Sequence, residues 1–203
     1  MIINALFPTP VVQFHFDDGV NEEEYKLVES LGSSQSIHLN EGNHSTKSTY
    51  IINNFPRINQ FVCESIDEYC KNIISAPVGC KFYITQSWIN YTKFGEYHHA
   101  HTHSNSIISG VFYFSASEEQ DKIYFMKSGY NQVKIYAEEY NVFNADKWWL
   151  PVKTGDLLLF PSSLAHMVEP VTSNKIRISL AFNVFAKGFL GSKDNLDELI
   201  LNT

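Results

Sequence analysis

Apolar positions divide the chain into a helical first part and a strand-rich second part. Between residues 56 and 74 apolar side chains recur at spacings of three and four, which predicts an amphipathic helix over Pro56–Ile74. From residue 80 onward the period shortens to two or to unbroken apolar runs, as in half-buried and buried strands. The expected strands are Lys81–Thr92, Ser106–Ser115, Ile123–Met126, Trp148–Val152, Asp156–Phe160, His166–Val171 and Ile176–Phe185.

The N-terminal part is expected to contribute one strand and one further helix. Residues 6–16 favour an edge strand, because their two prolines lie near its start. Asn21 is predicted to cap a helix that runs through Leu31. Glu24 completes a capping-box pattern at the start of this helix, and Gly32 ends it.

Three segments carry no clear period. Residues 33–54 are rich in Ser, Asn and Gly and are interpreted as a long loop, which is either a lid over a site or a surface excursion. Residues 128–146 are also loop-like. The tail after Gly191 has the charge and polarity of a frayed helix.

Short strands separated by turn residues favour a sandwich or jelly roll over a parallel sheet. We expect a mainly β (α+β) chain that folds as a single domain over residues 1–203. In this scheme residues 80–187 form the β core, and residues 1–79 supply the N-terminal strand and the supporting helices.

Composition and charge narrow the possible partners. The 44% hydrophobic content, with 15 Phe and 11 Tyr, suits an aromatic-rich β protein. The net charge of −7 and the scattered Lys and Arg residues disfavour binding to long nucleic acids.

The cysteines and the apolar runs indicate a cytoplasmic protein. Cys63, Cys70 and Cys80 leave one thiol unpaired in any disulfide scheme, so all three are interpreted as reduced core thiols. A Cys/His metal site is the rival interpretation, although the chain has no Cys-x-x-Cys motif. No apolar stretch reaches 18 residues and no charged leader precedes the first apolar run, so neither membrane insertion nor secretion is expected.

The strongest chemical signal is the histidine-rich stretch over residues 96–103. In an extended segment residues i and i+2 point the same way, so His99, His101 and His103 are expected to share one face and His98 the other. Two imidazoles from one strand end and His166 from a later strand would make a three-ligand metal site with open coordination positions. The alternative is a solvated loop whose histidines bind nothing.

The order of several short motifs supports the metal interpretation. They are Trp88-x-Asn90, His101-x-His103, Ser109-Gly110-x-x-Tyr113, Gly155-Asp156-Leu157 followed by Phe160-Pro161 and His166, and Arg177-x-Ser179. In this order they resemble the Fe(II)/2-oxoglutarate-dependent dioxygenase superfamily, and more narrowly its small 2-oxoglutarate–iron oxygenases from bacteria and phages. The resemblance covers roughly residues 80–187.

The resemblance implies a fold, an activity and a metal site. The fold would be a double-stranded β-helix (jelly roll) with flanking N-terminal helices. The activity would be that of an oxygenase, a hydroxylase by expectation, which couples oxidative decarboxylation of 2-oxoglutarate to succinate with oxidation of an unknown substrate by O2. His101, His103 and His166 match the positions of the catalytic metal ligands that hold Fe(II).

The resemblance also implies a site for the co-substrate 2-oxoglutarate. Arg177 matches the residue that grips the far carboxylate, which a guanidinium can bind with two hydrogen bonds. Ser179, two residues further on the same strand face, adds a hydroxyl donor. Tyr91, Tyr113 and Asn90 are further candidates for binding the oxoacid, although tyrosines in a β core often serve packing alone.

One departure from the superfamily bears on activity and metal choice. His103 stands where most members have Asp or Glu, so the site has one negative charge fewer and suits zinc and nickel as well as iron. Glu96 and Asp156 are the nearby carboxylates, and Asp156 is expected only to cap a turn.

Two other functions stay open on the same scaffold. One is a cupin-like three-histidine dioxygenase or isomerase that acts without 2-oxoglutarate; the other is a non-catalytic binding module. A buried Arg177 facing the metal would favour the oxygenase, whereas an outward-facing one would favour the cupin-like enzyme. The tryptophans Trp88, Trp148 and Trp149 line a cleft or serve as core and contact residues, and a homodimer through exposed strands is possible.

Overall fold

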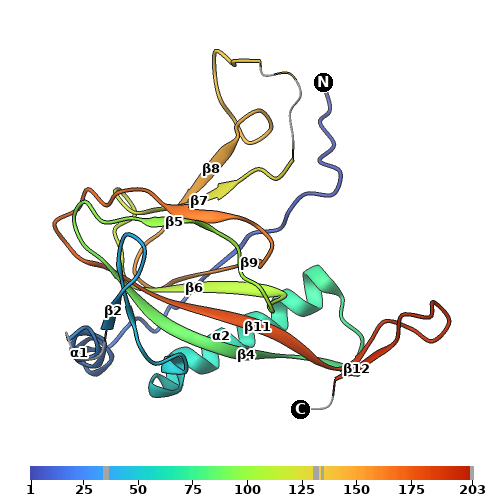
Figure 1. The fold of residues 1–203 in the computed structure, drawn as a ribbon, viewed down its shortest axis with the longest axis horizontal. Helices are drawn as coiled ribbons and strands as arrows, with labels where there is room; N and C mark the ends of the chain where they lie inside the picture. Colours follow the sequence, from blue (N-terminus) through green and yellow to red (C-terminus); the bar gives the residue numbers. More distant parts are fainter. Residues whose placement is uncertain (34–36, 130–132, 134, 202–203) are drawn as a thin grey trace.

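Two antiparallel β-sheets face each other in the computed structural model, which describes residues 1–33, 37–129, 133 and 135–201. The small sheet lies over one face of the large sheet, and a long helix runs along the opposite face (Figure 1). The large sheet has the strand order β1 (Val12–His15), β9 (Asp156–Pro161), β6 (Ile108–Ser115), β11 (Arg177–Leu190), β4 (Cys80–Thr92), β3 (His44–Thr46) and β2 (Ile37–Leu39), and β12 (Leu199–Leu201) pairs with β11. The small sheet has the order β5 (His98–His101), β10 (His166–Val168), β7 (Lys122–Met126) and β8 (Lys147–Pro151). This arrangement confirms the predicted mainly β jelly roll.

Alternation along the central strands sorts side chains between two cores. In β6, Phe112 and Phe114 pack in the outer core under the helices, whereas Val111 and Tyr113 pack in the inner core between the sheets. The same rule places Leu157 and Leu159 of β9 outward and Leu158 and Phe160 inward. Both faces of these strands are thus buried, which explains their nearly unbroken apolar sequence.

The two predicted helices form and cover the outer face of the large sheet. The helix α1 (Glu22–Leu31) begins with the expected capping box, in which the Asn21 side chain accepts from the Glu24 backbone N–H and Glu24 accepts from Asn21, both at 2.9 Å. The helix α2 (Pro56–Tyr69) continues as a π-helical turn over Cys70–Ile74. It buries the apolar stripe expected from its period as far as Cys70, whereas Ile73 and Ile74 are exposed.

Several element boundaries differ from the expectation. The segment 33–54 contains the β2–β3 hairpin and a 3₁₀ turn over Ile51–Asn54 in its described part, instead of loop alone. The tail forms β12 instead of a frayed helix, because Gly191 adopts φ 68° and turns the chain back onto β11. β1 covers only part of 6–16, and β11 extends to Leu190. The unexpected strands β2, β3 and β12 are only three residues long, and pairing with their neighbours determines them more than their own hydrophobic period does.

The cysteines are free, as expected, but only one of them is buried. Cys70 is buried, Cys80 is intermediate and Cys63 is exposed, so the prediction of three core thiols is wrong for Cys63, which lies on the solvent side of α2. Desolvation by burial raises the pKa of Cys70 to about 12, which makes this thiol unreactive. Within the described residues no helix has the length and apolarity needed to span a bilayer.

Gly110 allows β6 and β11 to approach each other, and we expect Gly110→Ala to destabilise the fold. A Cβ at residue 110 would lie 2.1 Å from Cζ of Phe182, whose ring is fully enclosed in the outer core. The ring has no space to retreat, so the substitution should lower the free energy of unfolding by about 1–3 kcal/mol. Denaturant unfolding measures this loss. Gly79→Ala is the matched control, because its Cβ would meet Phe189 at an ordinary 3.4 Å, and an equal loss in both variants would contradict the explanation.

Candidate metal centre

Three histidines from two paired strands converge between the sheets. His101 in β5 is the direct antiparallel partner of His166 in β10, and their ring centroids lie 4.4 Å apart. His103 follows β5 and is held by its backbone N–H, which donates to the Ser162 carbonyl at 3.0 Å. One ligand atom from each of these three side chains lies within 4.8 Å of the others. We call His101, His103 and His166 the inner cluster.

Two of the inner imidazoles are oriented by backbone carbonyls. Nδ1 of His101 lies 2.8 Å from the carbonyl oxygen of His99, and Nδ1 of His166 lies 3.1 Å from that of Leu164. A carbonyl oxygen only accepts, so each Nδ1 carries the proton and each Nε2 presents a lone pair. This arrangement of N–H to carbonyl is how proteins commonly fix metal-ligating histidines.

Burial keeps these imidazoles neutral. Desolvation, reinforced by neighbouring His101, lowers the pKa of His166 to about 3 and that of His103 to about 4. Desolvation likewise lowers the pKa of His101. At neutral pH the inner cluster therefore offers uncharged nitrogens, which is the form that binds a metal ion.

A buried guanidinium shares the same cavity. Arg177 opens β11 with only 4% of its surface exposed, and Nη2 donates to the Tyr113 hydroxyl at 3.3 Å. Its Nε has no hydrogen-bond partner and lies 3.8 Å from Oδ1 of the buried Asp121. Desolvation raises the pKa of Tyr113 to about 12, so its hydroxyl stays protonated. Arg177 thus keeps at least its Nε–H available for an anionic ligand.

The structure brings together most of the residues expected at this site. The inner cluster, Arg177, Ser179, Tyr113 and Asn90 all line one cavity of about 30 Å³. Ser179 shares the face of Arg177, as the strand period predicts. Asn90 is already engaged, since its Oδ1 accepts from the Ser45 hydroxyl at 2.6 Å and links the site to the β2–β3 hairpin.

Tyr91 does not lie at the site, which corrects the expectation for this residue. It follows Asn90 on β4 and therefore points to the opposite face of the sheet. There its ring joins the outer core and its hydroxyl donates to the Val28 carbonyl of α1 at 2.7 Å. Neighbouring strand residues cannot both face one ligand, so only one of the two candidates could have been right.

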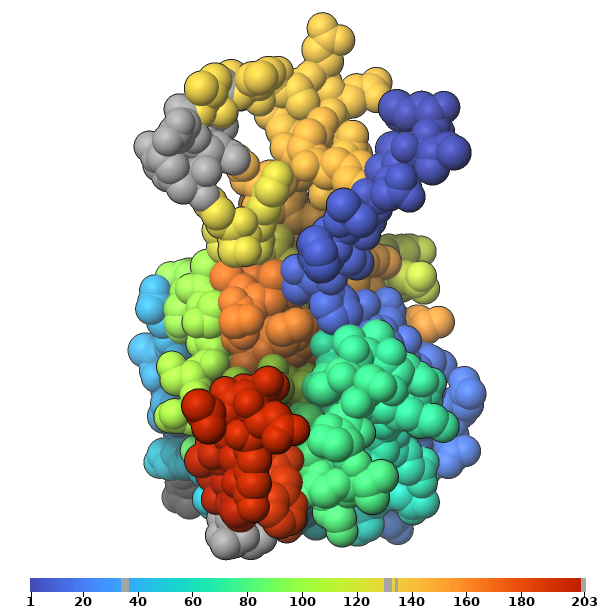
Figure 2. Space-filling view, turned by 90° about the vertical axis from the view of Figure 1, so that its right-hand side faces the viewer, coloured from blue at the N-terminus to red at the C-terminus, as the bar shows by residue number. Residues whose placement is uncertain are grey.

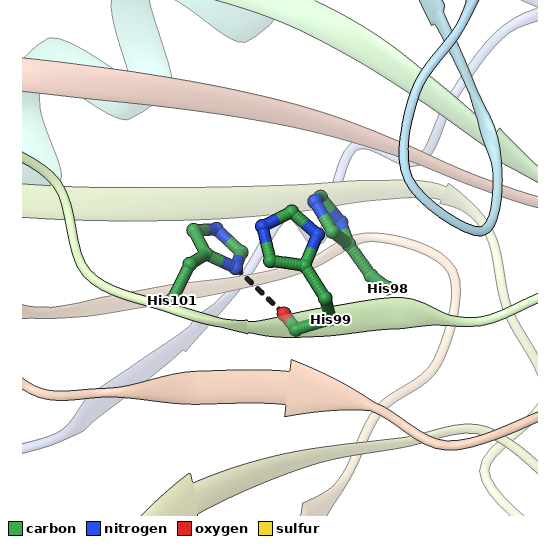
Figure 3. A group of neighbouring side chains, drawn as sticks. All are labelled: His98, His99 and His101. Carbon is green, nitrogen blue, oxygen red and sulfur yellow. Dashed lines mark hydrogen bonds between the residues drawn. The ribbon is translucent and has the colours of Figure 1, made fainter.

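His98 was expected to point away from the metal ligands but lies among them. The ladder between β5 and β10 pairs His101 with His166 and His98 with Val168, so β5 carries one extra residue. Such a bulge reverses the alternation, and the rings of His98 and His101 stack with centroids 4.6 Å apart. Figure 3 shows that His98, His99 and His101 all project from the same side of β5. Desolvation, followed by the effect of His101, lowers the pKa of His98 to about 3.

The nearby carboxylates are engaged elsewhere. Glu96 accepts from the Lys93 backbone N–H at 2.8 Å and lies 3.3 Å from Nδ1 of His44. Asp156 caps its turn as predicted, by accepting from the Lys153 N–H at 2.9 Å, and also pairs with His15. Among the described residues, the groups that could hold a metal ion here consist of histidines only.

The cavity adjoins a larger hollow beneath the β2–β3 hairpin. This hollow measures about 300 Å³ and is lined by hairpin residues together with Trp88, His98, His99, His101 and His103. Four of these residues also line the inner cavity, so the hollow lies directly beside the inner cluster. Trp148 and Trp149 lie on β8, away from this hollow, and stack on each other.

Comparisons with known proteins agree with this geometry. The family model described as "Putative 2OG-Fe(II) oxygenase" matches residues 86–183, which include the inner cluster and Arg177. No curated protein sequence matches the chain.

Several solved structures share the fold at low sequence identity. The 2-oxoglutarate-dependent epimerase SnoN from nogalamycin biosynthesis is 8% identical with a TM-score of 0.61, covering 89% of this chain and 81% of SnoN. HygX from Streptomyces hygroscopicus, solved with nickel, 2-oxoglutarate and hygromycin B bound, is 12% identical with a TM-score of 0.55, covering 87% of this chain and 82% of HygX. A Pseudomonas putida prolyl-4-hydroxylase is 12% identical with a TM-score of 0.57, covering 86% of this chain and 92% of the hydroxylase.

The lowered histidine pKa values predict a pH-dependent stability of the metal-free protein. The unfolded chain takes up protons on these histidines near their ordinary pKa of 6.5, whereas the folded chain resists protonation until about pH 4 at His103 and about pH 3 at His166. The unfolded state therefore binds more protons over this window, and stability falls as the pH is lowered below 6.5. We expect the midpoint of thermal unfolding of chelator-treated protein to fall steadily through this range. The variant H103N/H166N should show a shallower decline, and an equally steep one would contradict the assignment.

Asp121 and Arg177 are expected to be energetically coupled. Each is a buried charge whose nearest opposite charge is the other, so removing one leaves its partner without compensation. A double-mutant cycle with D121N and R177M, measured by denaturant unfolding, should give a coupling energy of about 0.5–3 kcal/mol. The exposed pair Lys147–Glu169 is the control and should give about 1 kcal/mol or less. Strictly additive losses at Asp121 and Arg177 would show that Asp121 does not hold Arg177 in place.

Proposed function

We propose a residue-by-residue arrangement for the activity of this chain, which belongs to the 2OG-Fe(II) oxygenase superfamily and is an enzyme of that class. The superfamily uses Fe(II) and 2-oxoglutarate and couples formation of succinate to oxidation of a substrate. The proposal assigns the metal to the inner cluster and the far carboxylate of 2-oxoglutarate to Arg177. The observation that carries it is the burial of Arg177 in the same cavity as three neutral imidazoles.

The inner cluster has the donor set that a divalent transition metal needs. His101, His103 and His166 present neutral nitrogens from two strands and leave coordination positions free for other ligands. Fe(II) held there would supply the oxidation chemistry, in which O2 is reduced, 2-oxoglutarate is decarboxylated and the substrate is oxidised. The carbonyls of His99 and Leu164 keep two of the rings in the tautomer that binding requires.

Arg177 and its neighbours would fix the orientation of 2-oxoglutarate. The guanidinium grips the far carboxylate, and the Tyr113 hydroxyl, which accepts from Arg177, can direct its own hydrogen to the same group. Ser179 adds a hydroxyl, while Asn90 is proposed to contact the oxoacid with its amide nitrogen, since its oxygen accepts from Ser45. Binding at both ends sets the reactive keto acid at the metal.

The walls of the cavity would exclude water. Val111, Ile123 and Phe160 form its apolar side, which strengthens the contact between the carboxylate and Arg177. The space of about 30 Å³ has the size of an ion or a water molecule, so bound 2-oxoglutarate would also occupy part of the adjoining hollow. The substrate would then approach through that hollow, beneath the β2–β3 hairpin.

The alternative functions fit the geometry less well. A cupin-like three-histidine enzyme has no use for a buried, half-satisfied guanidinium beside its metal. A non-catalytic module would not need three desolvated histidines, two of which are held in one tautomer by backbone carbonyls. Because His103 stands in place of a carboxylate, the inner cluster carries no negative charge. The positive charge of a metal held there would therefore be offset by the dianionic co-substrate and not by the protein ligands.

We also propose a cytoplasmic location and a homodimer for this chain. Three free cysteines are typical of a reducing compartment. β8 forms an edge of the small sheet, and an unpaired edge can pair with a second copy. The primary substrate is proposed to be small enough to enter the hollow of about 300 Å³.

Arg177 provides the sharpest test of the co-substrate site. We expect R177A to raise the 2-oxoglutarate concentration for half-maximal binding by about 30-fold or more, because loss of a buried charge pair costs at least about 2 kcal/mol. R177K, which keeps the charge but not the paired donors, should fall between R177A and the wild type. Thermal shift with Mn(II) measures binding, and iron-dependent succinate formation measures turnover. The control is K175A, which removes an exposed cation two residues away, and a folded R177A that binds 2-oxoglutarate normally would refute the assignment.

A further inference from the structure

A second group of histidines lies beside the inner cluster. One ligand atom each from His98, His99 and His101 lies within 4.8 Å of the others. Their ring centroids are 4.6 to 5.3 Å apart, and all three rings project from one side of β5 (Figure 3). We call these three residues the outer cluster. It faces the hollow of about 300 Å³, whereas the inner cluster lies deeper.

The bulge in β5 is what creates the outer cluster. A regular strand would turn neighbouring side chains to opposite faces, so at most alternate histidines could meet. The extra residue between His98 and His101 brings three nearly consecutive imidazoles together on one side of β5. The cluster is sparsely hydrogen-bonded: Nδ1 of His101 bonds the His99 carbonyl at 2.8 Å, Nε2 of His98 lies 3.4 Å from the Asn40 amide nitrogen, and Nδ1 of His99 has no partner. A bound cation would satisfy the nitrogen that lacks a partner.

His99 carries an unsatisfied nitrogen next to a carboxylate. Its Nδ1 is buried and has no hydrogen-bond partner, although the side chain as a whole is one-third exposed. Oε2 of Glu41, in the β2–β3 turn, lies 3.8 Å from this nitrogen. That is too far for a hydrogen bond, but it is close to the separation of about 3.4 Å between two ligands of one tetrahedral zinc ion with bonds of about 2.0–2.1 Å.

The two clusters share His101, which has only one nitrogen to give. Its Nδ1 is committed to the carbonyl of His99 at 2.8 Å, so only Nε2 can bind a metal. An ion in the outer cluster and an ion in the inner cluster therefore compete for the same atom.

We propose that His98, His99 and His101, with Glu41, form a second divalent-cation site that excludes a fully ligated ion from the inner cluster. Three imidazoles suit zinc, and the exposed Glu41 carboxylate, which lies near His99 but outside the group of mutually close ligand atoms, would turn toward the ion to close a four-ligand set. Zinc bound there removes His101 from the inner cluster and sits across the proposed route through the hollow. The existence of the outer site stands on its own geometry, and only the competition rests on the proposed function.

Metal titration of chelator-treated variants tests the outer site directly. H103A/H166A removes two inner ligands and should still bind one Zn²⁺ per chain, measured by competition with a chromophoric chelator. Co²⁺ in this variant should give the intense visible absorption of four-coordinate cobalt. Adding H99A should weaken Zn²⁺ binding at least about tenfold, as expected when a ligand is lost. H38A is the control, because His38 belongs to neither cluster.

The wild type provides an arm that does not depend on the double variant folding. Zn²⁺ should displace 2-oxoglutarate binding to the Mn(II)-loaded protein, and H99A should require at least about tenfold more Zn²⁺ for the same effect. His99 lines the hollow and not the inner cavity, so the effect of Zn²⁺ on each protein is compared with the affinity of that same protein for Mn(II) and 2-oxoglutarate measured without Zn²⁺.

Each failure points to a different conclusion. Loss of Zn²⁺ binding in a folded H103A/H166A, or two fully ligated ions per wild-type chain, would overturn the outer site or its competition. Unchanged Zn²⁺ sensitivity in H99A would also overturn it. Failure of wild type and H99A alike to bind 2-oxoglutarate with Mn(II) would instead count against the proposed function and leave the Zn²⁺ result of H103A/H166A standing.

Discussion

The pairing of β5 with β10 is the constraint on which the site depends. It sets His101 directly opposite His166, and the turn after β5 adds His103, so three imidazoles meet without any long loop. The same ladder contains the bulge that turns His98 toward its neighbours. A shift of one residue in this register would send every ligand to the wrong face. The small sheet that contains these two short strands faces the large sheet. Figure 2 shows the N-terminal segment and the described part of the β7–β8 connection projecting from the rest of the molecule.

The site combines neutral imidazoles with one buried ion pair between Arg177 and Asp121. The inner cluster is uncharged because burial suppresses protonation, and Arg177 is the buried cation that faces it. Asp121 offsets that charge from 3.8 Å without forming a hydrogen bond, so the guanidinium keeps a donor free. A site built in this way is arranged for an anion that bridges a metal and an arginine, which is the shape of a dicarboxylic oxoacid.

The sequence predicted the fold class from its strand periods. The order of its motifs also singled out His101, His103, His166 and Arg177, and the structure brings these four residues to one cavity. Their roles as metal ligands and as carboxylate anchor are proposals. The sequence could not tell which of Asn90 and Tyr91 faces the cavity, because the pairing of β4 with β11 decides which face of β4 lies toward it. The position of His98 was missed for a related reason, because a bulge leaves no mark in the alternation of so polar a strand. The β2–β3 hairpin and β12 were missed because their residues are polar and their partners distant in sequence. For the position of His98, the available signal in the sequence was that a further histidine precedes the His101-x-His103 motif.

The measurement that tests this account most directly is a crystal structure of the protein grown anaerobically with Mn(II) and 2-oxoglutarate. We predict one metal ion bound by Nε2 of His101 and His166 and by His103, with the keto acid end of 2-oxoglutarate on the ion and its far carboxylate on Arg177. A metal held without His166, or an oxoacid whose far carboxylate contacts neither Arg177 nor Tyr113, would contradict it.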